Sequence, residues 1–252
     1  MNGNSRHQII KHLQADLPRG APFGLAELER FGVSPQRAAR YADSGWLVRL
    51  GHGVYAFPND NFGAHSAVKF LQQRVPGLHI GGKSALAMQG VRHNLGSRDK
   101  LVLWGDARFT LPDWFTSRFP ARYVHACLFD WPSPTFAANT LITPPGQLEG
   151  LMVAVPERAI LELLYEVGVK QSLEEARNLF DGLRSPRKEL LGQLLSCCTS
   201  VKAVRLFLTW ARETGVVDVD ALLSQHEVRT GSDKRWMSRL EDGTILSLKP
   251  HG

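Results

Sequence analysis

One short motif in the chain has the residue types and spacing of a phosphate-binding loop. Residues Gly77 to Ser84 contain Gly, four further residues and then Gly-Lys-Ser, and the stretch from Leu101 to Asp106 resembles the acidic strand that helps to hold magnesium beside such a loop. In these loops, backbone N–H groups surround a phosphate at the start of a helix and the lysine contacts it. Nucleotide binding is therefore one hypothesis for this chain.

The residues around this motif favour another interpretation. A phosphate loop requires a buried strand that leads directly into the first glycine, but Gly77 follows the polar end of a predicted helix and Pro76. Leu78 and Ile80 alternate with period two, which favours a strand inside the motif. The repeated βαβ pattern of a parallel sheet is missing. We expect the two adjacent glycines to form a tight turn and Lys83 to lie on the surface, with no nucleotide cofactor.

Other catalytic patterns are absent from the sequence. A nuclease of the restriction-endonuclease type would need Glu-x-Lys to hold its metal, and neither this pattern nor G-x-S-x-G occurs. The 9 histidines are scattered singly, and no Cys/His group has zinc-finger spacing. Glu157 with Arg158, and Arg158 with Glu162, have the spacing of helix-surface ion pairs. We expect no enzyme, no metal and no cofactor.

A second set of polar residues has the types and spacing needed to contact DNA. Gln36, Arg37 and Arg40 fall on one side of a predicted helix, with Tyr41 at its margin. Amide and guanidinium groups form hydrogen bonds with base edges and phosphates. The alternative is that a small helical hairpin packs on the rest of the protein and its arginines are solvated.

The elements around these residues can be predicted from residue 23 onwards. Apolar residues between Leu25 and Phe31 share one helical face, and Gly32 ends that helix. Ser34 can cap a second helix, and Pro35 fits its first turn. Gly45 ends the second helix.

A hairpin follows over residues 46–57, with Arg49 beside a Gly51-His52-Gly53 tip, and an upstream helix from Arg6 to Leu17 would complete a three-helix core. This order is that of a winged helix-turn-helix, which usually places its second helix in the DNA major groove. The predicted DNA-binding residues are Ser34, Gln36, Arg37, Arg40, Tyr41, Arg49 and His52.

The charge distribution supports a polyanionic partner. The net charge is +6: residues 1–58 hold 7 basic and 4 acidic residues, residues 59–150 hold 9 and 6, and residues 151–252 hold 14 of each. The basic excess therefore lies in the first three-fifths, where a polyanion would dock. A basic isoelectric point is also common in proteins that bind no nucleic acid.

The cysteines and the N-terminus indicate a reducing, cytoplasmic setting. The chain has 3 cysteines, of which Cys197 and Cys198 are adjacent and poorly placed to pair with each other. The N-terminal residues contain no apolar signal region, and no apolar run approaches the roughly 20 residues that cross a membrane. We expect no membrane association.

Residues 59–252 alternate between strand and helix patterns. Strands are predicted at 78–80, 100–104, 122–128, 140–143 and 151–155, helices at 64–74, 156–167, from 172, at 185–197 and at 200–213, and a closing hairpin at 235–248 turned at Asp242-Gly243. Lys202, Arg205 and Arg212 line one side of the helix over 200–213, as a second basic surface or as a solvated face. We therefore expect an α+β protein, with a winged helix-turn-helix at residues 1–58 and a mixed α/β, largely helical domain at residues 59–252.

Four blocks of sequence in this order resemble the AbiEi family, the antitoxins and transcriptional regulators of abortive-infection, type IV toxin–antitoxin systems. The blocks are Trp46 to Tyr55, Ile80 to Gly90, Val155 to Leu164 and Val204 to Leu208, and the likeness extends to Lys234-Arg235 and the turn at Gly243. The resemblance implies that the loop at residues 81–84 is a family turn rather than a nucleotide site.

The resemblance also implies a function. The N-terminal winged helix would bind double-stranded DNA at inverted repeats in its own promoter, as a homodimer where the repeats require one, and repress the operon. The C-terminal domain would counteract a nucleotidyltransferase-like toxin, with or without direct contact. Two alternatives stay open: a winged-helix repressor whose C-terminal half senses a ligand or dimerises, and a P-loop nucleotide-binding protein.

Overall fold

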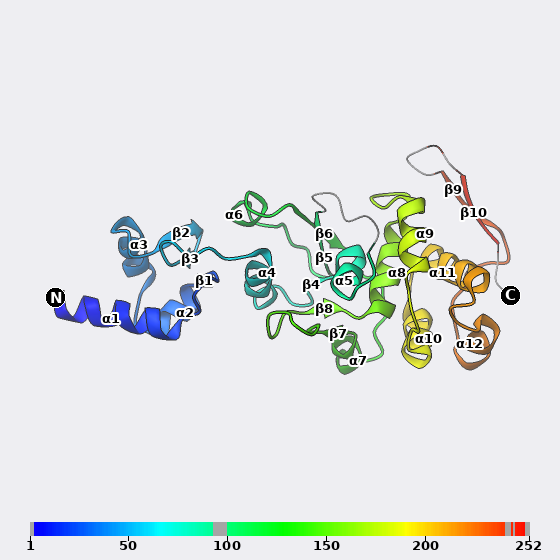
Figure 1. Cartoon of the computed structure of the whole chain (residues 1–252), viewed down its shortest axis with the longest axis horizontal. Coiled ribbons are helices and arrows are strands. Elements are labelled where there is room, and N and C mark those ends of the chain that lie inside the picture. The colour runs from blue at the N-terminus through cyan, green and yellow to red at the C-terminus, as the bar shows by residue number, and fades with distance from the viewer. Residues whose placement is uncertain (1–2, 93–99, 240–242, 244, 250–252) are drawn as a thin grey trace. The chain divides into compact units, whose positions relative to one another are not determined.

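The structure is a computed structural model that describes residues 3–92, 100–239, 243 and 245–249 (Figure 1). The chain divides into two compact units. Unit 1 comprises Met1–Val75 and Thr110–Pro120, and unit 2 comprises Pro76–Phe109 and Ala121–Gly252. Unit 1 thus continues past residue 58, and the division at that residue stays a prediction about the extent of the DNA-binding module.

Unit 1 contains the predicted order of helices and hairpin (Figure 1). Its elements are α1 (Gly3–Asp16), β1 (Phe23–Gly24), α2 (Leu25–Glu29), α3 (Pro35–Asp43), β2 (Val48–Gly51), β3 (Val54–Ala56), α4 (Ala64–Gln72) and α6 (Asp113–Thr116). The three strands form an antiparallel sheet in the order β1-β3-β2. The strand β1 was not predicted, because two residues are too short to show a period.

The start and end of α3 follow from local sequence, as predicted. The Ser34 hydroxyl accepts a hydrogen bond from the Arg37 backbone N–H at 3.3 Å, so it caps the helix ahead of Pro35. Gly32 and Gly45 both have positive φ, 69° and 75°, and end α2 and α3 respectively. These glycines orient α3 relative to α2 and the hairpin.

The core of unit 1 lies between the first three helices and the sheet. Leu13, Leu28 and Ala38 are fully buried, and the small Ala38 side chain lets α2 and α3 approach closely. The buried residues of this core are Ile10, Leu13, Leu17, Phe23, Leu28, Val33, Ala38, Tyr41, Leu47, Tyr55 and Phe57.

Helix α6 packs against the hairpin. A Cβ atom added at Gly51 would lie 2.9 Å from Cδ1 of Trp114, so a glycine is needed where the hairpin touches the indole ring. Trp114 also packs edge-on against Phe70 of α4, with ring centroids 5.9 Å apart. Arg74, two residues after the end of α4, forms an ion pair with Glu27 of α2 at 2.7 Å. Segments far apart in sequence thereby fix the position of the hairpin.

Unit 2 is a mixed sheet covered by helices. Its elements are β4 (His79–Ile80), α5 (Gly82–Met88), β5 (Leu101–Gly105), β6 (Ala121–His125), α7 (Pro134–Asn139), β7 (Leu141–Ile142), β8 (Val153–Ala154), α8 (Pro156–Glu166), α9 (Leu173–Asp181), α10 (Lys188–Cys197), α11 (Val201–Thr214), α12 (Val219–Gln225), β9 (Trp236–Arg239) and β10 (Ile245–Leu248). The five-stranded sheet has the order β6-β5-β4-β8-β7, in which β5/β6 and β4/β8 are parallel. The predicted α+β class is confirmed.

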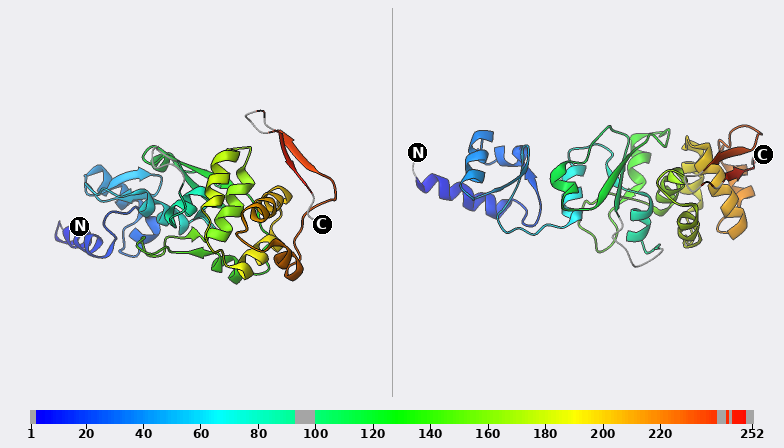
Figure 2. Two further views of the ribbon diagram at one scale, coloured as in Figure 1. Left: turned by 45° about the vertical axis from the view of Figure 1, so that its right-hand side comes forward. Right: turned by 90° about the horizontal axis from the view of Figure 1, so that it is seen from above.

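Helix α8 lies between this sheet and the helices that follow it (Figures 1 and 2). It contacts α5 and β8 on the sheet side and α9, α10 and α11 on the other. Both faces of α8 are therefore covered, and its charged residues Glu157, Arg158 and Glu162 are buried. The expected ion pair between Arg158 and Glu162 forms at 2.7 Å, but the expectation that it lies on the surface is wrong, because the helix has no solvent-facing side at those positions. Glu157 pairs with Arg187 rather than with Arg158.

The C-terminal hairpin is confirmed as the antiparallel pair β9–β10. Asp242 of the predicted turn lies outside the described residues. Gly243 has a φ of 85°, a conformation that a glycine adopts without strain.

Candidate nucleic-acid interface

Helix α3 presents three polar side chains to solvent, those of Gln36, Arg40 and the acidic Asp43. Gln36 and Arg40 are exposed, whereas Arg37 is half-buried and its guanidinium donates to the Gly32 carbonyl oxygen at 3.3 Å. Arg37 therefore also helps to hold the turn between α2 and α3. Of the three polar residues predicted on this face, Gln36 and Arg40 have the exposure that a base or phosphate contact requires.

Two other predicted residues have roles inside unit 1. The Ser34 side chain is exposed, and its hydroxyl oxygen is already engaged in capping α3. Tyr41 was expected at the margin of the DNA-facing side, but its side chain is only 3% exposed and packs in the core. Tyr41 follows Ala38 by three residues and so shares its inward face. The prediction that Tyr41 contacts DNA is corrected accordingly.

The hairpin carries the remaining two predicted residues. Arg49 and His52 are both exposed, on β2 and at the tip. The register between β2 and β3 shifts between Arg49 and Gly51, and Gly53 has a φ of 67°. An irregularity of this kind redirects the strand end and the side chains beside it.

Apolar side chains beside the hairpin are a feature that the sequence reasoning missed. Trp46 is 36% exposed and Val48 is 41% exposed, while Leu47 between them is buried. Alternate residues of a strand lie on opposite faces, so the sequence could have predicted that Trp46 and Val48 share one face and Leu47 lies on the other. The surface next to Arg49 is therefore partly apolar.

The predicted second basic surface on α11 does not exist as such. Arg205 is 1% exposed and donates hydrogen bonds to the carbonyl oxygens of Thr230, Ser232 and Lys234. Lys202 is half-buried, and Arg212 is exposed but ion-paired with Asp220 at 2.7 Å. The prediction fails because the segment after α12 covers the face on which Arg205 lies.

The start of α5 is occupied by a carboxylate. The Gly82 backbone N–H donates to Oε2 of Glu162 at 2.9 Å, and a Cβ atom added at Gly81 would lie 2.3 Å from the same oxygen. Lys83 forms an ion pair with Glu175 at 3.0 Å. A phosphate in this position would have to displace a buried acidic side chain. The P-loop hypothesis is therefore contradicted.

Glu162 is the centre of a buried polar cluster. Its Oε1 lies 2.8 Å from Nε2 of His79 and accepts a hydrogen bond from Arg158 at 2.7 Å. Arg158 in turn donates to the Thr140 hydroxyl at 2.9 Å. Burial by itself raises the pKa of Glu162, but the charges of His79 and Arg158 and the hydrogen bonds from His79 and Gly82 lower it below its ordinary value. The cluster joins β4, α5, α8 and Thr140, the residue that follows α7.

The described residues show no arrangement for metal binding, and two of the three cysteines are buried thiols. Across residues 3–92, 100–239, 243 and 245–249, no group of three or more His, Cys, Asp or Glu side chains could hold a metal ion. Burial raises the pKa of Cys197 to about 11 and that of Cys198 to about 12, so both thiols stay protonated at neutral pH. No helix in this part of the chain has the length and apolar character needed to cross a membrane.

Comparison with protein families covers nearly the whole chain. Residues 6–97 match the N-terminal domain of the AbiEi antitoxin transcriptional regulators, and residues 98–248 match the family described as transcriptional regulator, AbiEi antitoxin, type IV TA system. The chain belongs to the AbiEi family. The resemblance inferred from the four sequence blocks is thereby confirmed, and the family is one of antitoxins and transcriptional regulators.

A solved structure with the same fold supports the architecture of this AbiEi chain. The crystal structure of the RV2827C protein from Mycobacterium tuberculosis matches with a TM-score of 0.57 and 18% sequence identity, and the match covers 94% of this chain and 90% of that one. Comparison with curated proteins gave no match.

Proposed function

We propose that this protein represses its own toxin–antitoxin operon by binding the promoter through a winged helix in unit 1, and that it counteracts a nucleotidyltransferase-like toxin encoded beside it. The first part is supported by the geometry of unit 1. The second part, including its assignment to the C-terminal residues, is supported by membership of the AbiEi family.

The observation that carries the DNA-binding proposal is the exposure of Gln36 and Arg40 on a capped helix, beside a hairpin that exposes Arg49 and His52. Helix α3 contacts β2, so helix and hairpin form one surface of unit 1 (Figure 1). In the proposed complex Gln36 and Arg40 contact base edges or phosphates in the major groove. Arg49 and His52 contact the backbone or the minor groove.

Arg37 and Ser34 take supporting roles in this proposal. Arg37 lies at the turn between α2 and α3, where a backbone phosphate would meet both its side chain and the start of α3. An operator with inverted repeats would bind two copies of the chain, with half-sites about 34–36 Å apart.

The mechanism is occupancy of the promoter rather than a chemical reaction. The protein would act in the cytoplasm, where its DNA target and a reducing environment for free thiols are both present. The cysteines that the structure describes, Cys127, Cys197 and Cys198, are all free.

A promoter–reporter experiment in cells tests this function. The reporter gene is placed behind the DNA upstream of the operon, and the protein is supplied from a second plasmid. We expect wild-type protein and an Arg184→Ala control, which removes an exposed arginine of unit 2, to lower the reporter signal equally. Arg40→Ala should raise it towards the level seen without the protein. Equal repression by wild type and both variants would remove Arg40 from the interface.

Growth rescue tests the antitoxin part separately. The neighbouring gene is expressed alone and with each variant. We expect toxicity from the neighbouring gene alone and restored growth with wild type and with Arg40→Ala alike. A neighbouring gene that is harmless, or toxicity that no variant relieves, would contradict the antitoxin role while leaving the repressor role to be judged by the reporter.

A further inference from the structure

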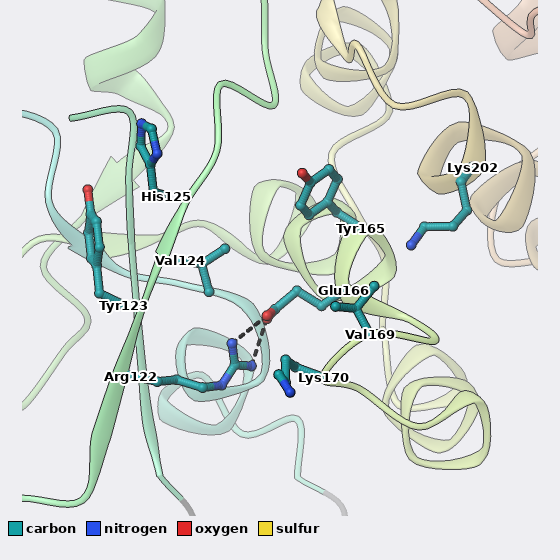
Figure 3. A pocket seen from close by; sticks show the side chains of 9 residues that line it. All are labelled: Arg122, Tyr123, Val124, His125, Tyr165, Glu166, Val169, Lys170 and Lys202. Atoms are coloured by element: carbon teal, nitrogen blue, oxygen red, sulfur yellow. Dashed lines mark hydrogen bonds and ion pairs between the residues drawn. The ribbon is translucent and has the colours of Figure 1, made fainter. Parts of the chain in front are cut away.

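Unit 2 contains a pocket of about 520 Å³ beside the free edge of its sheet (Figure 3). One wall is the edge strand β6, and the others are the end of α8, the loop after it and the first turn of α11. The lining residues are Arg122, Tyr123, Val124, His125, Tyr165, Glu166, Val169, Lys170 and Lys202. A volume of this size lies within the range of small-molecule sites, roughly 300–1,000 Å³.

Basic side chains outnumber acidic ones in this pocket. Arg122 and Glu166 point towards each other and form two hydrogen bonds, so the single carboxylate of the lining is already neutralised (Figure 3). Lys170 is exposed at the pocket, and Lys202 reaches it from α11. The pocket therefore carries a net positive charge from two lysines.

Lys202 is an unusual group for a protein surface, because it is half-buried. Its Nζ donates to the Val167 carbonyl oxygen at 2.8 Å, and no carboxylate among the described residues forms an ion pair with it. Burial lowers the pKa of Lys202, and the charge of Glu166 only partly opposes this. Lys202 is therefore an amine that a ligand in this pocket could reach without displacing a paired carboxylate.

The pocket also has an apolar wall. Tyr165 lies between β6 and Lys202 in Figure 3, and the ammonium group of Lys202 is 5.7 Å from its ring centroid. Val124 points to the same space, and Val169 is 55% exposed beside it. A flat ring could lie against these side chains, because aromatic faces and valine methyl groups favour such contact. The pocket therefore contains both cationic side chains and an apolar wall.

Two further lining residues, Tyr123 and His125, form their hydrogen bonds outside the pocket. The Tyr123 hydroxyl donates to the Ala107 carbonyl oxygen at 2.7 Å, and Nε2 of His125 lies 3.1 Å from the Asp106 carbonyl oxygen. Successive residues of a strand point to opposite sides, which leaves Arg122 and Val124 facing the pocket.

We propose that this pocket binds a phosphate monoester attached to a planar ring, with the phosphate held by Lys170 and the ring against Tyr165 and Val169, beside the amine of Lys202. Lysine is suited to phosphate as a compact point charge. All the residues involved lie in unit 2, so the proposal is independent of the DNA-binding function of unit 1.

Pyridoxal 5′-phosphate is a suitable probe, because it joins a phosphate monoester, a planar ring and an aldehyde that reports which lysine it reaches. The neutral amine of a lysine adds to the aldehyde carbon and water leaves, giving an imine. Borohydride then donates hydride to the imine carbon, and the nitrogen gains a proton to give a stable secondary amine. Peptide mass spectrometry on the full-length protein measures the extent of labelling at each lysine.

We expect Lys202 to be labelled at least about tenfold faster than Lys188, an exposed lysine on α10. Pyridoxal, which lacks the phosphate, should label Lys202 about tenfold more slowly than its phosphate ester does. Phenyl phosphate should protect Lys202. Lys170→Gln should remove most of the advantage of the phosphate ester, whereas Arg212→Gln, a change on α11 away from the pocket, should leave it intact.

Two results would overturn the proposal. Labelling of Lys202 that is no faster than that of Lys188 would show that the pocket does not admit the probe. Equal rates with pyridoxal and its phosphate ester would show that Lys202 is merely reactive and that no phosphate site exists. Thermal unfolding of each variant shows whether it is still folded. The protection of Lys202 by phenyl phosphate is measured on wild-type protein and therefore does not depend on the folding of any variant.

Discussion

At the scale of single residues, the strongest constraint in this protein is the burial of charge on α8. Glu157, Glu162 and Glu166 are each at most 6% exposed, and each is held by an arginine or histidine from another part of the chain or from the helix itself. A buried charge is tolerated only when it is paired and hydrogen-bonded. These residues therefore determine which segments can pack around α8.

Removing Glu162 should therefore be costly. Glu162→Ala leaves His79 and Arg158 buried without their shared carboxylate and frees the Gly82 N–H, so we expect a loss of about 3–5 kcal/mol in the free energy of unfolding. Urea unfolding followed by circular dichroism measures it. Glu189→Ala, at an exposed position on α10, should cost less than about 0.5 kcal/mol. Equal losses in the two variants would show that the cluster does not stabilise unit 2.

At the scale of elements, local signals in the sequence predicted the helices and hairpin of unit 1 and the C-terminal hairpin of unit 2, but not the long-range side-chain pairs of unit 2. Ser34, Pro35 and the glycines at 32 and 45 act on their own neighbours, so α2, α3 and the hairpin could be predicted from them. His79 and Glu162 are 83 residues apart, and the local sequence around each of them does not predict that they form a pair. The buried cluster was for this reason mistaken for surface ion pairs.

The candidate site shows the same limit at finer resolution. The periodicity of a helix places Gln36, Arg37 and Arg40 on one side of α3. It does not show which residue at the edge of that side is buried in the core. The structure buries Tyr41 and ties Arg37 to Gly32. On α11 the period grouped Lys202, Arg205 and Arg212, and the covering segment at 230–234 could not be foreseen from it.

Arg205 should act as the anchor of the segment that follows α12. Its guanidinium donates to three carbonyl groups of that segment, at every second residue from Thr230 to Lys234, which a glutamine cannot do with one amide. We expect Arg205→Gln to increase amide hydrogen exchange in residues 226–235 while leaving α3 unchanged. Arg212→Gln, on the same helix but exposed, should leave both regions as in wild type. Unchanged exchange in the Arg205 variant would contradict the anchoring role.

The loop before α5 should have no affinity for nucleotides. Glu162 already accepts the hydrogen bond from the Gly82 N–H, and Lys83 is paired with Glu175. We expect magnesium with ATP or GTP to leave the melting temperature of wild type and of Lys83→Ala unchanged. A rise in wild type that Lys83→Ala abolishes would restore the P-loop hypothesis.

At the scale of the whole molecule, stability should depend on pH through the buried carboxylates. Burial raises the pKa of Glu157, but its hydrogen bonds with Arg187 bring the net value below the ordinary 4.5, as the cluster does for Glu162. A carboxyl group with a lowered folded pKa contributes stability that is present above its unfolded pKa and is lost as the pH falls through its folded pKa.

We therefore expect the free energy of unfolding to fall steadily as the pH is lowered below about 4.5, and to change little through these two groups above it. Urea titrations at a series of pH values measure the slope. In Glu162→Gln the slope should be shallower, because one of the two groups no longer titrates. An identical slope in wild type and in this variant would show that other carboxyl groups govern the acid limit.

The central claim, that unit 1 binds the DNA upstream of its own gene through α3, is tested most directly by fluorescence anisotropy. Purified wild type, Arg40→Ala, Arg37→Ala and Arg184→Ala are titrated onto a labelled upstream fragment, with unrelated competitor DNA and at several salt concentrations. The account predicts tight binding that survives competitor and weakens steeply with salt. It predicts a loss of about 1–3 kcal/mol in Arg40→Ala and none in Arg184→Ala. Equal binding to any DNA, or wild-type affinity in both the Arg37 and Arg40 variants, would contradict it.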